Sequence, residues 1–382
     1  MNIKSLILGS ATVALAATGA QAADAIIIAE PEPVEYVRVC DVYGAGFFYI
    51  PGTETCLRIG GEIRAQYGTA SSDDTGRNFY RMNDDRWNSH ARARLYFDAR
   101  SETELGQLRG YVRLDTARTD GASANNTYLN HAWLSLGGFR AGWTDSAWVS
   151  TPQGGRAAGG SHSDTGFAYG YHQTHLVQYN FAGSGGFFGT ISAEFDDTAG
   201  AANYMPDVVG VVGINQGWGA AWLKVGYDED RDAIDPVTGL PIDDSGFGVT
   251  AGLHYNIPGA SGSSFRLLGF YADSDNIYNP LTGTGFGGLG GAEWSVMASY
   301  YHQFNAQFGA SIGAQYFSDL YFSGTDVNSG IDGWAIELNT VWTPVENFAV
   351  RGELVYTNFD YPAASGFKDS SVSGFVRFSR FF

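Results

Sequence analysis

Arginine is the residue type in this sequence whose number and spacing best suit a chemical role. It recurs on alternating positions of three neighbouring segments, at Arg58, Arg64, Arg92, Arg94, Arg100, Arg109 and Arg113. A guanidinium group stays charged under all conditions and makes forked contacts with carboxylates and phosphates. The spacing therefore predicts a fixed positive wall that contacts solutes, and it does not suit proton transfer.

The other residue types that carry chemistry are scattered. The seven histidines form no metal-ligand pattern, and neither a G-x-S-x-G motif nor another nucleophile–base arrangement occurs. Gly283, Gly285 and Gly288 match G-x-G-x-x-G, but they lack the strand-to-helix context that a dinucleotide site requires. We therefore predict that the chain is not an enzyme and holds no cofactor and no metal.

The segments that carry the arginines have the alternation of β-strands, in which successive side chains point to opposite faces. At the end of the chain, Ser371–Phe382 places Val372 and Val376 on one face and Arg377 on the other. Sixteen segments of this kind can be counted, beginning with Leu57–Tyr67. A single such strand would also fit the edge of a soluble sheet. Repetition, with short turns alternating with long loops, favours a membrane barrel with a wet interior.

Composition narrows the class of protein further. The formal net charge of -18 argues against nucleic-acid binding, which needs basic surfaces. Aromatic residues make up 15% of the chain, which contains 52 glycines and 11 prolines, as expected for many short strands. Because backbone groups in lipid must pair internally, a β protein spans a membrane only as a closed barrel. We predict an all-β fold, a 16-stranded antiparallel transmembrane β-barrel.

The first 22 residues have the three parts of a secretory signal peptide. Lys4 supplies the charged region, Leu6–Ala17 the apolar region, and Ala20–Ala22 the cleavage site before Ala23. This pattern predicts export and a mature chain that begins at Ala23.

Cys40 and Cys56 are the two cysteines of the chain. In an exported protein an even pair across a short loop predicts a disulfide, which would stabilise that loop by about 3 kcal/mol. We therefore divide the chain into a signal peptide (1–22), a periplasmic extension with a disulfide loop (23–55) and a transmembrane barrel (56–382).

The alternation stops between Thr144 and Thr174. Structureless segments of this length are usually functional or disordered. This one carries Asp145, Arg156 and Asp164, and we predict that it lies inside the barrel and narrows it.

Two further loops are acidic, with carboxylates at Asp73, Asp74, Asp84, Asp85, Asp228, Glu229, Asp230 and Asp232. We expect these loops to face outside and draw cations to the mouth of the barrel. They either bridge divalent ions to anionic lipid headgroups or remain solvated charge runs.

Three stretches of the chain are specific enough to compare with known proteins. They are the run from Glu32 to Ile59, the run A-W-L-S-L-G-G-F-R-A-G from Ala132 to Gly142, and the closing F-V-R-F-S-R-F-F. All three resemble the alphaproteobacterial general porins. The resemblance implies a homotrimer in the bacterial outer membrane that passes small hydrophilic solutes by diffusion. It also implies that the loop after the fifth strand, here Thr144–Thr174, folds inward. Some barrels of this kind are joined to peptidoglycan through an Ala-Asp or Ala-Glu terminus, which makes Ala23 a candidate attachment site.

These observations predict a passive diffusion channel whose partners are outer-membrane lipid and lipopolysaccharide. The alternatives are a substrate-selective channel and a mainly structural tether between the membrane and peptidoglycan. The predicted pore-lining residues are Arg58, Arg64, Arg92, Arg94, Arg109, Arg113, Asp145, Arg156 and Asp164. We expect Asp145 and Asp164 to lie across the lumen from arginines of the first three strands, because opposed charges at a constriction orient solutes.

Overall fold

The computed structural model describes residues 38–68, 88–119, 126–150, 160–195, 205–230, 233–235, 237–242, 244–280, 288–362 and 369–382. The predicted signal peptide, Ala23 and Arg156 lie outside these ranges. Within them, the model contains no helix of the length and hydropathy needed to cross a membrane.

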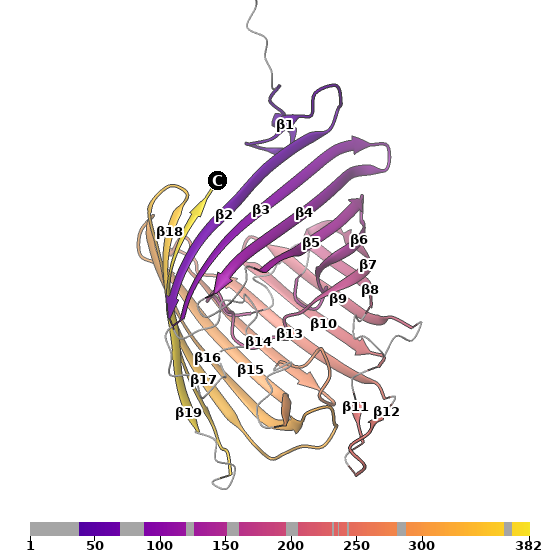
Figure 1. Ribbon diagram of the computed structural model, residues 1–382, viewed down its shortest axis with the longest axis vertical. Helices are drawn as coiled ribbons and strands as arrows, with labels where there is room; N and C mark the ends of the chain where they lie inside the picture. The colour runs from indigo at the N-terminus through magenta and orange to yellow at the C-terminus, as the bar shows by residue number, and fades with distance from the viewer. Residues whose placement is uncertain are drawn as a thin grey trace, which may run out of the picture. The chain divides into compact units, whose positions relative to one another are not determined.

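Sixteen antiparallel strands form a closed barrel, as the alternation predicted (Figure 1). They are β2 (Cys56–Gly68), β3 (Asn88–Thr103), β4 (Gly106–Thr119), β5 (Asn126–Leu136), β6 (Phe139–Asp145), β7 (Gln173–Ala182), β8 (Phe187–Phe195), β9 (Asp207–Gln216), β10 (Gly219–Asp228), β13 (Gly246–Asn256), β14 (Ser264–Ala272), β15 (Leu289–Gln303), β16 (Phe308–Phe322), β17 (Gly333–Val345), β18 (Phe348–Phe359) and β19 (Ser370–Phe381).

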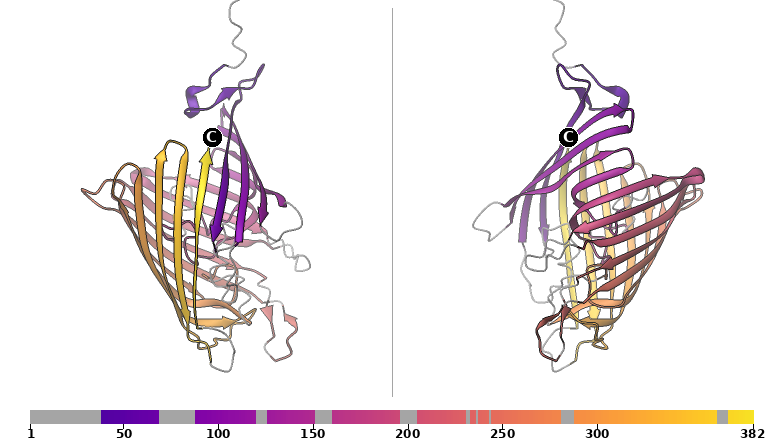
Figure 2. Two further views of the ribbon diagram at one scale, coloured as in Figure 1. Left: turned by 60° about the vertical axis from the view of Figure 1, so that its left-hand side comes forward. Right: turned by 90° about the vertical axis from the view of Figure 1, so that its right-hand side faces the viewer.

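The ring closes where the last strand meets the first (Figure 2). β19 pairs with β2 in a register that places Phe378 opposite Ala65 and Arg377 opposite Gln66. Beyond the strand, the backbone of Phe382 exchanges two hydrogen bonds with Gly61, of 2.9 and 3.1 Å. Closure pairs each of these sixteen strands on both sides, which is the condition for a sheet to sit in lipid.

The barrel turns its apolar side chains outward. On β19, Val372 and Val376 are 67% and 45% exposed, whereas Arg377 is 4% exposed on the inner face. The same parity exposes Ile63 on β2 and buries Arg64. The predicted assignment of the two faces is therefore confirmed.

The loop before the barrel is tied to the first strand. Cys40 and Cys56 form the predicted disulfide, which joins this loop to the first residue of β2. Between them lie a 3-10 turn, η2 (Asp41–Tyr43), and β1 (Phe48–Tyr49), which pairs with β2. Phe47 is buried against the disulfide.

The described residues form three further small elements outside the barrel strands. A two-stranded hairpin, β11 (Ala233–Ile234) and β12 (Pro241–Ile242), lies in the loop after β10, and η5 (Ser184–Gly186) lies in the turn before β8.

Part of the barrel interior is filled with apolar side chains. We use the name packed half for the inner faces of β8–β10 and β13–β18 together with the loop residues that cover them, in 146–150, 160–172 and 273–280. Trp148 and Tyr278, one from each loop, are 1% exposed and lie 5.4 Å apart between ring centroids. A Cβ at Gly226 or Gly248 would come within 2.7 Å of Tyr278, so glycine on these strands admits the loop.

One acidic residue lies elsewhere than the sequence suggested. Asp228 is 5% exposed and accepts a 3.0 Å hydrogen bond from the backbone N–H of Ile277. The expectation that Asp228 faces outside to draw cations is therefore wrong, because its carboxylate holds the loop 273–280 inside the barrel. Asp73, Asp74, Asp84, Asp85 and Asp232 lie outside the described residues.

Candidate functional site

The inner faces of β2, β3 and β4 carry the arginines, and we call Arg58, Arg64, Arg92, Arg94, Arg100, Arg109 and Arg113 the arginine wall. Toward the end of the barrel with short turns, its charges converge on Asp98. The Asp98 carboxylate is fully buried and accepts 2.6 Å and 2.8 Å contacts from Arg100 and Arg109, with Arg58 at 3.7 Å. Sheet register explains the convergence, because Arg58 lies directly opposite Asp98 and Arg100 opposite Arg109.

A second cluster lies further along the same strands. Glu62 is 3.2 Å from Arg64 and 3.3 Å from Arg92, and Asp115 is 2.9 Å from Arg94. Arg113 completes the wall by donating a hydrogen bond to Asn130. Seven arginines against the carboxylates of Glu62, Asp98 and Asp115 leave an excess of four positive charges (7 − 3).

In the loop between β6 and β7, which we call loop 146–172, the described residues 146–150 and 160–172 are bound to the inner faces of strands from around the barrel. At its start, the N–H of Ala147 donates to Glu194 on β8 at 2.9 Å, and Lys224 on β10 donates to the carbonyl of Trp148 at 2.6 Å. Further on, Arg266 on β14 donates to the carbonyl of Ser161 at 2.6 Å. These contacts hold the loop inside the barrel.

The far end of the loop is anchored on β16 and β18. Gln315 on β16 exchanges two hydrogen bonds with the backbone of Ala168, at 2.7 and 3.1 Å. Glu353 on β18 accepts from the N–H of Asp164 at 2.9 Å and from the hydroxyl of Thr165. A buried carboxylate is stabilised by such backbone and hydroxyl donors, so the loop is fixed at both ends.

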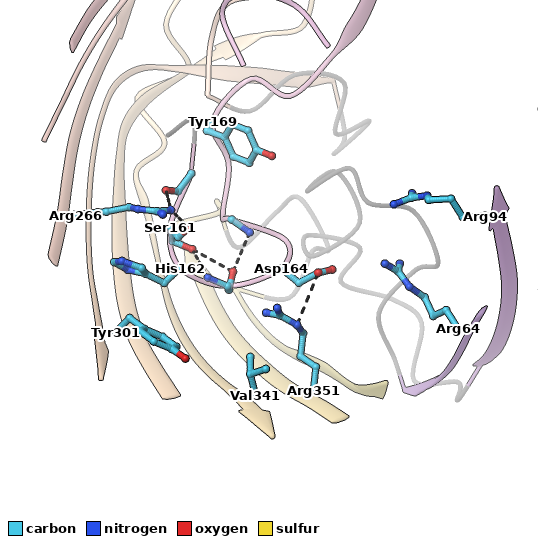
Figure 3. Close-up of a pocket in the computed structure, with 13 residues that line it drawn as sticks. Arg64, Arg94, Ser161, His162, Asp164, Tyr169, Arg266, Tyr301, Val341 and Arg351 are labelled. Carbon is cyan, nitrogen blue, oxygen red and sulfur yellow. Dashed lines mark hydrogen bonds and ion pairs between the residues drawn. The ribbon is translucent and has the colours of Figure 1, made fainter. Parts of the chain in front are cut away.

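The two loop carboxylates differ in their partners. Asp164 forms ion pairs with Arg377 on β19 and, at 3.8 Å, with Arg351 on β18. Asp145 accepts a hydrogen bond from the hydroxyl of Tyr171 at 2.9 Å. These partners lie outside β2–β4, while the view across the lumen shows Asp164 opposite Arg64 and Arg94 (Figure 3).

A cavity of 570 Å³ separates the loop from the arginine wall. Arg64 and Arg94 line it on the wall side, and Asp164 with Arg266 and Arg351 line it on the other (Figure 3). Four of the charged lining residues are arginines and one is an aspartate, so the cavity carries three more positive than negative charges (4 − 1).

His162 lies in the loop at the edge of this cavity. Its ring nitrogens are 2.7 Å from the hydroxyl of Ser299 and 2.9 Å from that of Ser264. Burial, followed by the charge of Arg266 and by His254, lowers the pKa of His162 to about 3. The imidazole is therefore neutral at pH 7 and positions the loop without adding charge.

The structure adds Lys224, Arg266, Arg351 and Glu353 to the residues expected from the sequence. Each is one of few charges on its strand, so no run of arginines marked it. The alternation of side chains along β18 could have placed two of them in the lumen, because Arg351 and Glu353 lie on its inner face. The loop contacts of these residues depend on tertiary structure, which local alternation does not specify.

Comparison with known proteins agrees with this architecture. A family model described as the porin subfamily matches residues 24–375. Porin Omp2b of Brucella canis (strain ATCC 23365) is 34% identical over 407 residues, which cover 100% of both chains. Porin Omp2a of Brucella ovis is 42% identical over 254 residues, covering 60% of this chain and 71% of its own.

Among solved structures, the outer membrane channel DcaP of Acinetobacter baumannii matches with a TM-score of 0.63 at 16% identity. The match covers 87% of this chain and 99% of that one. At this identity the likeness shows the fold alone, and the family rests on the sequence comparisons. The chain belongs to the porin subfamily and is a channel of the bacterial outer membrane, not an enzyme.

Proposed function

We propose that this porin passes small hydrophilic solutes and ions by passive diffusion, and that the constriction of its pore is the 570 Å³ cavity between the arginine wall and loop 146–172. The observation that carries the proposal is the charged lining of this cavity, with arginines on both sides. Among the described residues, this charged cavity lies beside the apolar packed half, which supports a route for solutes on the side of the arginine wall.

The charges of the constriction support a preference for anions. Its lining carries an excess of three positive charges (4 − 1), and a surface of one sign raises the local concentration of the opposite ion. Asp164 faces Arg64 and Arg94 across the cavity (Figure 3), and such opposed charges give a field transverse to the pore that orients dipolar solutes.

Single-channel recording in a planar bilayer tests this function. A general diffusion pore gives a current that rises linearly with voltage and does not saturate with solute concentration. Saturation and block by one solute at low concentration would instead make the protein a substrate-selective channel. Absence of conductance from correctly folded protein would contradict the proposal.

We propose that the protein is a homotrimer whose subunits meet through β2–β6. The outward Trp and Tyr side chains of a barrel mark its contact with lipid interfaces. On β7–β19 those exposed are Tyr179, Tyr227, Tyr255, Trp294, Tyr300, Tyr316, Trp334, Trp342 and Tyr356. Among the described residues of β2–β6, only Tyr67 and Tyr128 are exposed in this way, which supports a protein contact on that side and lipid or lipopolysaccharide on the other.

A matched pair of substitutions tests the trimer face. Leu95 on β3 and Leu338 on β17 both point outward, at 42% and 51% exposure. Leu95→Gln should convert SDS-resistant trimers to monomers, whereas Leu338→Gln should leave the trimers intact. The reverse pattern would place the interface on the other side of the barrel.

We also propose that the mature terminus at Ala23 is joined to peptidoglycan, a function in addition to the pore. The support is the Ala-Asp start and the family resemblance, since these residues lie outside the described ranges. Digesting purified cell walls and sequencing the bound peptides tests the link. Absence of a wall-linked fragment beginning at Ala23 would remove it.

A further inference from the structure

A second group of charges lies in the lumen on β4, β5 and β6, near the end of the barrel with short turns. In the sheet register Arg109 lies opposite Ser135, and Ser135 lies opposite Arg140. The three side chains therefore form one row across three adjacent strands. Along β3, Arg100 of the same row and Arg94 of the constriction are six residues apart, which is about 20 Å at 3.3 Å per residue. The row is thus distinct from the constriction.

The arginines of this row are held on an aromatic surface. Trp133, next to the row on β5, stacks on Tyr111 with ring centroids 5.3 Å apart. The guanidinium of Arg109 lies 4.9 Å from the Trp133 ring and that of Arg140 lies 4.4 Å from it. Stacking of this kind fixes the plane of a guanidinium without using its N–H donors. The Nε and one terminal nitrogen of Arg109 already donate to Asp98, at 2.8 and 2.9 Å. Arg140 and the other terminal nitrogen of Arg109 are therefore oriented for a further partner.

Charge compensation in this region is incomplete. Asp98 is the shared ion-pair partner of Arg58, Arg100 and Arg109. In the part of the chain that the structure describes, Arg140 has no ion pair or hydrogen bond, and its buried Nε has no acceptor. A guanidinium out of bulk water costs free energy unless an anion or acceptor meets it. Arg58, Arg100, Arg109 and Arg140 outnumber the two aspartates that act on them, Asp98 and Asp145, so an excess of two positive charges remains around the row (4 − 2).

We propose that Arg109, Ser135 and Arg140 form a binding site for small oxyanions, carrying carboxylate or phosphate groups, at the short-turn end of the pore. Strands lie about 4.8 Å apart, so the backbones of Arg109 and Arg140 are roughly 10 Å apart. Charge-assisted contacts of about 2.8 Å from each side let one oxyanion bridge the two guanidiniums, with the Ser135 hydroxyl as a third donor. Because turns are short on the periplasmic side of such barrels, the site lies at the periplasmic exit.

Block of chloride current by inorganic phosphate in planar bilayers tests this site. Phosphate added at the short-turn side should reduce the wild-type current in a saturable manner. Arg140→Gln should raise the half-blocking concentration roughly tenfold, since it removes one charge-assisted contact. Ser135→Asp places a carboxylate between the two arginines, which should preserve folding and abolish the block. Arg140→Lys, which keeps the charge but loses the fork, should be intermediate.

Arg380→Gln is the matched control. It removes an arginine at the same end of the barrel, on the exposed outer side, and should leave the block unchanged. Equal half-blocking concentrations in wild type, Arg140→Gln and Ser135→Asp would overturn the proposal. Wild-type channels that conduct normally but are not blocked by phosphate would also overturn it, while leaving the proposed diffusion function intact.

Discussion

The arginine wall and the packed half are made of the same alternating strands, yet they use inward polar residues in opposite ways. On β2–β4 several arginines share each strand, and three carboxylates leave them an excess of charge beside open space. On β8–β18 charged side chains such as Lys224 and Glu353 are few on each strand, and they bind the backbone of inward loops. Inward charge thus lines a pore where it is dense and anchors a loop where it is sparse.

Removing the side chain at the centre of the packed half should have the largest effect on loop stability and on conductance. Trp148 is 1% exposed, packs against the tilted ring of Tyr278 and donates a 3.2 Å hydrogen bond to the carbonyl of Tyr169. Trp148→Ala should destabilise the docked loop by about 3 kcal/mol and raise single-channel conductance with added current noise. Trp342→Ala removes the same side chain from the lipid face, where Trp342 is 49% exposed, and should leave conductance unchanged. Equal conductance in both variants would argue against the packed half as a support for the constriction.

The matching change in the arginine wall is Asp98→Asn. It leaves Arg58, Arg100 and Arg109 facing one another without a carboxylate, and breaking a buried ion-pair network of this kind costs about 3 kcal/mol. Part of that cost is offset by water in the lumen, so we expect a smaller loss than for Trp148. Urea unfolding in lipid vesicles measures it, with the exposed Asp326→Asn as the control. A variant as stable as wild type would show that water alone satisfies these arginines.

Neutralising the constriction should change selectivity more than stability. One unit charge at about 5 Å in water-like surroundings raises the local concentration of an anion about fourfold and lowers that of a cation about fourfold. In Arg64→Gln combined with Arg94→Gln, the anion-to-cation permeability ratio should therefore fall by a factor of up to about sixteen for each charge removed. Reversal potentials in a salt gradient give this ratio, and the effect should shrink as salt screens the charges. Arg380→Gln on the outer face should not change it. An unaltered permeability ratio in the double variant would show that the arginine wall does not determine ion selectivity.

The pH dependence of loop docking should be the smallest effect. Because the pKa of His162 falls to about 3 in the docked loop and is about 6.5 when free, the released loop binds more protons. The contribution of His162 to the free energy of loop docking is therefore fully present above pH 6.5 and is lost as the pH falls toward 3. Current noise should increase between pH 7 and pH 5 in wild type but not in His162→Asn. His175→Asn, an exposed histidine on β7, is the control and should behave as wild type.

Much of the barrel was predictable from the sequence, because alternation is a local property. It located the sixteen strands and their inner and outer faces, and the pair of cysteines located the disulfide between Cys40 and Cys56. The same rule did not reveal that Asp228 holds loop 273–280, nor that Arg266 and Arg351 face the cavity. These depend on which loops fold inward and how closely they approach, and glycines such as Gly226 permit that approach only in the assembled sheet.

The central claim is that solutes pass between the arginine wall and loop 146–172 while the packed half stays dry. Modification of single introduced cysteines by a charged thiol reagent tests it directly, because Cys40 and Cys56 are joined in a disulfide. Arg94→Cys lies on the cavity, and Ala335→Cys replaces a fully buried inner residue of β17 in the packed half. We predict that the reagent reacts with Arg94→Cys and lowers its conductance, and that Ala335→Cys stays unmodified. Rapid modification of Ala335→Cys, with Arg94→Cys unreactive, would place the water-filled path on the other side of the barrel and contradict this account.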